Sequence, residues 1–251
     1  MTTRADGRSA DAARPISIET GFQRNPEGSV LYRCGGTRVL ISASVDEGVS
    51  GWMRGSGKGW VTAEYAMHPR ANPQRMDRDG RKGRGIDGRT QEIQRLIGRS
   101  LRAAVRPEKL GERTITIDCD VLDADGGTRT ASVTGGFIAL ALALDKLRAK
   151  GAIGAGVLRS PVAAISAGLV GPSALLDLNY VEDSKADVDL NVVATGDGGI
   201  VEVQGTAEGA PVPHARWTAL VELSLSAMPG LFAAQEAALA QAGVALDRLL
   251  R

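Results

Sequence analysis

Apolar and polar residues alternate with a period of two in the N-terminal part of the chain. In residues 28–45, GSVLYRCGGTRVLISASV, the alternation runs on both sides of Gly35 and Gly36, which predicts a β-hairpin. Residues 114–122, TITIDCDVL, alternate in the same way, which is typical of a half-buried strand. Residues 55–88 have no such period and are rich in Gly, Arg, Pro and Asn. We therefore expect that segment to be largely loop, and a loop of that length usually carries function.

A helical period replaces the alternation in the middle and at the end of the chain. In residues 90–105 the apolar side chains share one helical face: Ile93, Leu96, Ile97, Leu101 and Ala104. A long apolar helix is predicted over about residues 130–150. Two C-terminal helices are predicted to be separated at Pro229 and Gly230, because proline cannot donate the hydrogen bond that continues a helix.

Four further segments have the apolar patterns of strands: residues 162–170, 174–180, 187–195 and 199–206. Hairpin-like neighbours outnumber strict βαβ alternation, so the order of elements predicts an α+β fold with split-βαβ character. No Pro- or Ser-rich linker divides the chain, and we expect a single domain over residues 15–251. Residues 1–14 are polar, and we expect them to form a flexible N-terminal arm.

Composition narrows the classes of function. The chain has only two histidines, His68 and His214, which makes zinc-dependent hydrolysis or a histidine-based catalytic triad a poor fit. Cys34 and Cys119 lack metal-site spacing and fit free thiols in a reduced cytoplasmic protein. Apolar stretches such as FIALALALDKL look too short and too interrupted by charge for a membrane span, and the N-terminus lacks the apolar region of a secretory signal. We therefore expect a cytoplasmic protein with no membrane contact.

Positive charge is concentrated between Arg70 and Arg102. The whole chain carries a net charge of +1, but this window holds nine Arg and one Lys against four acids, or about +6. Arginine forks separated by small polar residues are suited to contacts with phosphate groups, as in RNA. The alternative is a solvated basic loop.

Two glycine-rich motifs could bind phosphate. GSGKG at residues 55–59 is not a nucleotide P-loop, because Trp52 occupies the position of its first glycine and Gly59 follows Lys58 where Ser or Thr is needed. DADGGTRTAS at residues 123–132 fits better, since a strand there passes through two glycines into an apolar helix. Backbone N–H groups and a helix N-terminus bind anions, and Thr128 and Arg129 add donors. The alternative is a glycine turn with a threonine cap.

Five acids lie close together in DLNYVEDSKADVDLN, residues 177–191. In an extended strand Asp187, Asp189 and Asn191 share one face, and the two carboxylates are about 7 Å apart. Such carboxylates repel one another unless a cation lies between them, and oxygen ligands suit magnesium (Mg²⁺) or manganese. The alternative is an acidic strand edge that prevents aggregation. A basic loop, an anion cradle and an acidic metal site together are the parts that phosphoryl transfer at a phosphodiester requires.

Several longer stretches, in this order, resemble the ribonuclease PH family of phosphorolytic exoribonucleases. They are RADGR at residues 4–8, ETGF, EGSVL, GRTQEIQRLIGRSLR, CDVLDADGGTRTAS, DLNYVEDSKADVDLNVV and EVQGTAEG, and they span nearly the whole chain. Ala5 stands where the family commonly has proline. The resemblance implies an α+β fold like that of the second domain of ribosomal protein S5, and a ring of six subunits built as three dimers.

The resemblance also implies roles for individual residues. Arg89 matches an arginine that the family uses at the phosphate and the RNA 3′ end, and the phosphate-binding turn matches Gly127, Thr128 and Arg129. The acidic pair would be Asp183 and Asp189, as the catalytic groups and the ligands of Mg²⁺, whereas the strand pattern alone favours Asp187 with Asp189. We follow the family here, because residues 184–186 can turn, and keep Asp187 as a secondary candidate. The residues expected to bind the RNA backbone are Arg70, Arg75, Arg78, Arg81 and Arg89.

The implied activity is phosphate-dependent 3′-to-5′ trimming of tRNA precursors and other RNA 3′ ends. Inorganic phosphate is then a co-substrate, and the product is a nucleoside diphosphate. Two alternatives stay open: a non-catalytic RNA-binding subunit of a ring, and a nuclease that uses water in place of phosphate.

Overall fold

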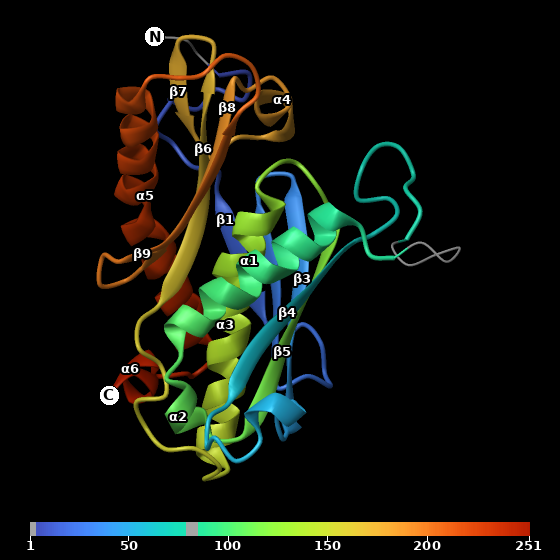
Figure 1. Ribbon diagram of the computed structural model, residues 1–251, viewed down its shortest axis with the longest axis vertical. Helices are drawn as coiled ribbons and strands as arrows, with labels where there is room; N and C mark the ends of the chain where they lie inside the picture. The colour runs from blue at the N-terminus through green and yellow to red at the C-terminus, as the bar shows by residue number, and fades with distance from the viewer. Residues whose placement is uncertain (1–3, 79–84) are drawn as a thin grey trace.

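Two β-sheets form the body of the computed structural model, which describes residues 4–78 and 85–251 (Figure 1). The strands of the first sheet are β1 (Ile16–Thr20), β2 (Gly28–Cys34), β3 (Thr37–Glu47), β4 (Trp60–Met67) and β5 (Arg113–Asp123). Their order is β1-β2-β3-β5-β4, with β4 parallel to β5 and the other pairs antiparallel. The predicted hairpin of residues 28–45 is confirmed as β2 and β3, in which Cys34 pairs with Thr37.

The second sheet is antiparallel and contains the later strands. These are β6 (Val162–Val170), β7 (Ser173–Leu176), β8 (Val188–Thr195) and β9 (Ile200–Ala207), in the order β7-β6-β8-β9. In Figure 1 this sheet lies above the first, with the long helix α5 (His214–Gln241) along one side.

Helix α3 (Thr128–Ala149) joins the two sheets, because it packs on β2 and β3 of the first and on β6 of the second. It is buried on nearly all sides, and Gly28 lies where a Cβ atom would overlap the carbonyl group of Ala139. Helix α1 (Gly88–Ala104) covers β4 and contacts α3. The remaining helical segments are short: η1 (Gly51–Met53), α2 (Pro107–Leu110), α4 (Tyr180–Asp183) and α6 (Leu246–Leu250).

Three expected elements differ from the structure. Strand β4 lies inside the segment expected to be loop, and its buried residues Val61, Ala63 and Tyr65 alternate as a strand requires. The short run was obscured by the Gly- and Arg-rich residues around it. Residues 180–183 form a helical turn and not the end of a strand, because the Asn179 side chain caps that turn.

The third difference is α5, which continues through Pro229 without a break. Both Pro229 and Gly230 are exposed, and buried residues on either side of them, Met228 and Leu231, pack against the second sheet's core. Farther along, the Gln235 amide donates hydrogen bonds to the carbonyl oxygens of Thr134 and Val162. Tertiary packing therefore outweighs the missing hydrogen bond of the proline.

Helices α3 and α5 are long and apolar enough to cross a membrane by length and composition alone. The central helix of a globular core passes the same test, and 83% of the apolar window of α3 is buried. In α5 only 22% of that window is buried. Apolar stretches that stand out in the sequence, such as FIALALALDKL, are shorter than either helix.

The described part of the arm, residues 4–14, lies against the second sheet and the turn before α3. Arg4 and Arg14 are each only 6% exposed, which differs from the exposure expected for a flexible polar arm. The difference arises because their guanidinium groups meet carboxylates and carbonyl groups that are distant in the sequence. The single domain expected over residues 15–251 stays a prediction.

Candidate active site

The turn between β5 and α3 has the geometry of an anion site. Gly126 and Gly127 have φ angles of 74° and 65°, in the left-handed region that favours glycine. A Cβ atom on Gly126 would also overlap the carbonyl oxygen of Leu178. The Thr37 hydroxyl fixes the turn, since it donates to the Gly126 carbonyl oxygen at 2.7 Å and accepts from the Asp125 amide at 2.9 Å.

The N-terminus of α3 is not capped by a side chain. Its N-cap residue is Gly127, and no side-chain cap hydrogen bond forms there. The hydroxyl of Thr128 bonds instead to the Tyr65 hydroxyl at 2.8 Å, and that of Thr130 donates to the Gly127 carbonyl oxygen. The first N–H groups of the helix therefore remain available to an anion. This geometry contradicts the alternative of a simple threonine cap.

Two arginines stand beside this turn. Arg89 is exposed at the first turn of α1, where its backbone amide donates to the N-cap carboxylate of Asp87 at 3.1 Å. Arg129 is largely buried at the start of α3, and its Nη1 donates to Gln204 at 2.7 Å and to Glu92 at 3.2 Å. Gln204 in turn donates to the same Glu92 oxygen at 2.5 Å. The Arg129 guanidinium is thus fixed before any ligand arrives.

Asp183 and Asp189 come from the second sheet. Asp183 ends α4, whose N-terminus is held by a capping box of Asn179 and Glu182. Asp189 lies in β8 opposite Gly168 of β6 and Thr206 of β9. One turn of helix followed by a short connection brings the two carboxylates to one place.

The basic and acidic groups line the same cavity, of about 380 Å³. Its wall includes the candidate residues of both sheets: Arg89, Gly127, Thr128, Arg129, Asp183 and Asp189. Asn191 and Tyr180 lie beside the acids, and Asn72 and Met76 contribute from the loop after β4. The sequence therefore predicted six residues that the fold brings together from three distant segments.

Burial shifts the proton equilibria of both acids. Asp183 is exposed overall, but it lines the cavity, and loss of water there raises the pKa of its carboxyl group despite the opposing charges of Arg89 and Arg129. Burial and then the neighbouring charge of Asp183 raise the pKa of Asp189. Two carboxyls with raised pKa values in a cavity are candidates for acid–base chemistry or for binding a cation.

Asp187 lies elsewhere, which overturns the pairing that the strand pattern favoured. It precedes β8, its carboxylate accepts a hydrogen bond from the Gly171 amide at 3.0 Å, and it lines a separate hollow with Arg216. Asp187 therefore stabilises the turn between β6 and β7. The pattern was misleading because the strand begins only at Val188.

The basic loop is near the cavity, but its described arginines, Arg70, Arg75 and Arg78, do not line it. Arg70, Arg75 and Arg78 are exposed, and Arg75 forms an ion pair with Asp77 at 3.1 Å. Arg81 lies outside the described residues. Their proposed contact with RNA stays a prediction.

Sequence reasoning missed several residues around the site. Glu92 and Gln204 hold Arg129, Tyr65 bonds Thr128, and the charge of Glu208 contributes to the raised pKa values of Asp183 and Asp189. Gln204 and Glu208 fall in EVQGTAEG, so that motif was visible, but nothing in its spacing indicated which partners they meet.

The described side chains do not form a complete metal site by themselves. Within residues 4–78 and 85–251, no group of three or more His, Cys, Asp or Glu side chains is arranged to hold a metal ion. Mg²⁺ commonly takes one or two carboxylates together with substrate phosphates and water. Asp183 and Asp189 fit that mode of binding.

Comparisons with known proteins agree with the geometry. The sequence profile of the 3′ exoribonuclease family, domain 1, matches residues 12–144, and that of domain 2 matches residues 160–227. Ribonuclease PH of Mycobacterium ulcerans (strain Agy99) is 54% identical over 241 residues, covering 96% of this chain and 93% of the relative. Ribonuclease PH of Crocosphaera subtropica (strain ATCC 51142 / BH68) is 53% identical over 239 residues, covering 95% and 98%.

Solved structures share the fold at lower identity. Rrp46 of rice (Oryza sativa) superposes with a TM-score of 0.75 at 17% identity, covering 93% of this chain and 98% of that one. A chain of the Archaeoglobus fulgidus exosome with RNA bound to the active site gives a TM-score of 0.75 at 22% identity, covering 91% of each. The predicted α+β fold of the ribonuclease PH type is confirmed.

Proposed function

Since this chain belongs to the 3′ exoribonuclease family of ribonuclease PH, we propose that it is a phosphate-dependent 3′-to-5′ exoribonuclease that trims the 3′ ends of tRNA. It transfers the terminal nucleotide to inorganic phosphate and releases a nucleoside diphosphate. The observation that carries this proposal is the cavity in which an uncapped helix N-terminus and two arginines face two carboxylates.

Inorganic phosphate binds at the N-terminus of α3. The free N–H groups of the first turn, the Thr128 hydroxyl and the Arg129 guanidinium donate to its oxygens, and Arg89 reaches the site from α1. These donors place one phosphate oxygen for attack on the last phosphodiester. Positioning and neutralisation of charge supply most of the rate in such a reaction.

The attack forms a bond between that phosphate oxygen and the phosphorus of the terminal nucleotide, and it breaks the bond from that phosphorus to the preceding 3′ oxygen. The leaving oxygen takes up a proton, so the products are a nucleoside diphosphate and an RNA shortened by one residue. The raised pKa values of Asp183 and Asp189 favour a proton-bearing carboxyl near the leaving oxygen. We propose Asp183 and Asp189 as the catalytic residues, either of which could supply this proton.

Asp183 and Asp189 are also the proposed holders of Mg²⁺, whose charge would lower the electrostatic cost of bringing anionic RNA and phosphate together. Both carboxylates line the cavity wall, so in their ionised form they would hold the ion together with oxygens of the substrate. A cation at this place also offsets the repulsion between the two acids.

RNA is held mainly by its backbone. Arg70, Arg75, Arg78, Arg81 and Arg89 are the proposed phosphate contacts, and the three described arginines of the loop are exposed. The chain has only three Phe, three Tyr and three Trp, so base stacking is limited and sequence preference is weak.

A ring of six identical subunits in the cytoplasm is the proposed assembly. Ile200 and Val203 on β9 are 49% and 44% exposed, and α5 buries little of its apolar length within one subunit. Apolar surface of this extent is typical of a subunit interface. A mass several times 26.2 kDa by light scattering is the expected result, and a fully active monomer would contradict it.

One assay tests the proposed activity. Purified protein and Mg²⁺ are mixed with a tRNA bearing a 3′ extension, with and without inorganic phosphate, and the released nucleotides are identified. Nucleoside diphosphate that forms only with phosphate supports the proposal. Nucleoside monophosphate without phosphate indicates hydrolysis, and RNA binding without any product indicates a non-catalytic subunit.

A further inference from the structure

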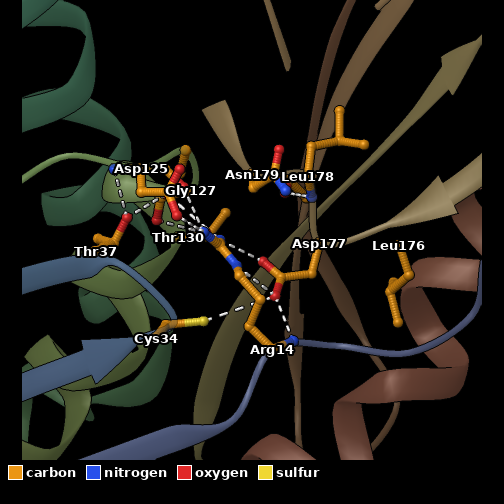
Figure 2. Close-up of polar contacts among 12 residues, drawn as sticks. Arg14, Cys34, Thr37, Asp125, Gly127, Thr130, Leu176, Asp177, Leu178 and Asn179 are labelled. Atoms are coloured by element: carbon orange, nitrogen blue, oxygen red, sulfur yellow. Dashed lines mark hydrogen bonds and ion pairs between the residues drawn. The ribbon is translucent and has the colours of Figure 1, made fainter. Parts of the chain in front are cut away.

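Arg14 lies in the interior between the phosphate-binding turn and the segment that leads to Asp183. Figure 2 shows its side chain between Asp177 on one side and the turn that carries Gly127 on the other. Its backbone amide and Nε donate to Asp177 Oδ2 at 2.7 and 2.9 Å, and Nη2 donates to Oδ1 at 2.6 Å. Such a two-pronged contact fixes both side chains in orientation as well as in distance.

The same guanidinium also holds the phosphate-binding turn from behind. Nη1 donates to the carbonyl oxygen of Asp125, and Nη2 lies 3.4 Å from that of Gly126. A Cβ atom on Gly127 would come within 2.9 Å of Nη2, so the turn lies directly on the arginine. The same turn lines the cavity with Gly126, Gly127 and Thr128.

Asp177 is also held in place on the acidic side of the cavity by its own backbone. Its φ angle is 51°, a left-handed conformation that is uncommon outside glycine, and its amide donates to the Ser166 carbonyl oxygen at 2.7 Å. Two residues later Asn179 caps α4, the helical turn that ends at Asp183. Displacement of Asp177 is therefore passed on to the proposed catalytic carboxylate.

We propose that Arg14 is a positioning residue that sets the placement of bound phosphate relative to Asp183, through its simultaneous contacts with the turn at Asp125 and Gly126 and with Asp177. This inference rests on the proposed function for the identity of the anion and of the acid. Arg14 is not among the residues that line the cavity. It acts through the two segments that it joins.

The chain offers a matched control in Arg4. Arg4 is also 6% exposed and also forms a two-pronged ion pair, with Glu182 at 2.7 and 2.5 Å. Its other contacts are carbonyl oxygens of the arm and of Leu176 and Asp177, all on the acidic side of the cavity. Replacement of Arg4 therefore removes a comparable buried ion pair without touching the phosphate-binding turn.

The test compares Arg14→Lys and Arg14→Gln with Arg4→Lys and Arg4→Gln in the full-length protein. The apparent KM for phosphate and kcat are measured at saturating RNA, with melting temperature and assembly mass measured alongside. Neither replacement at residue 14 can bridge both segments, so we expect KM for phosphate to rise about tenfold and kcat to fall about tenfold or more. The Arg4 variants are expected to leave KM for phosphate within about twofold of wild type while lowering kcat.

Asp177→Asn tests the contact of Arg14 with Asp177 separately from its contact with the phosphate-binding turn. Asparagine tolerates the left-handed conformation, so the backbone is kept while the charge that holds Arg14 is removed. The turn at Asp125 and Gly126 keeps its contacts with Arg14, so kcat is expected to fall further than phosphate affinity.

Three results overturn the inference. The first is wild-type KM and kcat in folded Arg14 variants. The second is an equal rise in KM for phosphate in the Arg4 variants. The third is that the Arg14 and Asp177 variants all fail to fold while the Arg4 variants fold, which would make the pair a folding element and not a positioning one.

The test also separates this inference from the proposed function. If wild type releases no nucleoside diphosphate, the proposed function fails, and positioning is then judged by binding of inorganic phosphate in calorimetry. Loss of that binding in Arg14→Lys but not in Arg4→Lys supports the role of Arg14 at the turn, and equal binding in both contradicts it.

Discussion

Two pairs of carboxylates on one short segment have opposite environments. Asp177 and Glu182 accept hydrogen bonds from the buried guanidinium groups of Arg14 and Arg4. Burial alone would raise the pKa of each of these carboxyls, but the arginines lower it. Asp183 and Asp189 line the cavity, and among the residues that the structure describes they form no ion pair. Burial raises their pKa values.

It follows that the number of acids in a segment says little about their task. A carboxylate within hydrogen-bonding distance of an arginine stabilises the fold and holds its proton weakly. A carboxylate turned to a cavity without such a partner costs stability at neutral pH, and that cost is tolerated where the group has chemistry to perform. The first pair builds the site, and the second pair is proposed to act in it.

Asp189→Asn removes the charge of one of the two cavity acids, Asp183 and Asp189, and should have the largest effect on activity. Turnover should fall by about 10²-fold or more if the group acts in acid–base or metal chemistry. A raised pKa means that the ionised carboxyl opposes folding above that pKa, so melting temperature at pH 7 should be unchanged or slightly higher. Turnover and melting temperature are measured on the same preparation.

Asp183→Asn should behave like Asp189→Asn, while Asp187→Asn is the matched control from the same segment. Asp187 hydrogen-bonds Gly171 outside the cavity, so its replacement should leave turnover within a few-fold of wild type. Near-normal turnover in folded Asp189→Asn would show that Asp183 and Asp189 form only a solubilising strand edge. The proposed difference in task between the two pairs of acids would then be wrong.

Arg129→Ala tests the cation that faces the unpaired acids. Without this charge-assisted contact to an anion, KM for phosphate should rise by about tenfold or more and turnover should fall, with RNA affinity changed much less. Steady-state kinetics at varied phosphate give the answer. Normal phosphate dependence in this variant would place the anion site elsewhere.

A smaller effect is expected when arginines of the basic loop are replaced, and it concerns the salt dependence of RNA binding. Arg75, Arg78 and Arg81 replaced together by Ala should flatten the dependence of log K for RNA on log salt by about 0.7 unit for each RNA phosphate that the protein no longer neutralises. The control is Arg33→Ala, an arginine of an exposed ion pair with Glu19, which should leave the slope unchanged. An unchanged slope in the triple variant would show that the loop is only solvated surface.

The weakest effect concerns the pH dependence of stability. The lowered pKa values of Asp177 and Glu182 mean that their contribution is present above the unfolded-state pKa and disappears as pH falls through the folded-state value. Wild type should therefore lose melting temperature on acidification, and Glu182→Gln should lose less over the same range. A steeper loss of melting temperature in Glu182→Gln than in wild type would contradict a stabilising ion pair between Glu182 and Arg4.

The sequence predicted those parts of the molecule in which the cause is local. The hairpin at Gly35 and Gly36 and the glycine turn that begins α3 at Gly127 follow from residues that are neighbours in the chain. The identity of the acidic pair did not follow from strand parity, because the strand begins one residue after Asp187. Only the family resemblance indicated Asp183.

The parts that could not be predicted depend on distant partners. Arg14 and Arg4 lie in a polar segment whose composition suggested flexibility, and the carboxylates that they bind are more than 160 residues away. Strand β4 was hidden because its stability comes from parallel pairing with β5, which follows it only after α1. Such pairings are decided by packing of the whole chain.

The separation in sequence between Arg4 and Glu182, 178 residues, has a consequence for the order in which the protein becomes active. Contacts between segments so far apart must close a very large loop, and in synthesis they cannot form until the later segment has left the ribosome. The arm therefore remains unpaired while the first sheet and α3 fold. The proposed phosphate-binding turn at Gly127 is synthesised before Asp183 and Asp189, so a nascent chain that stops short of those residues lacks the carboxylates proposed to act on RNA.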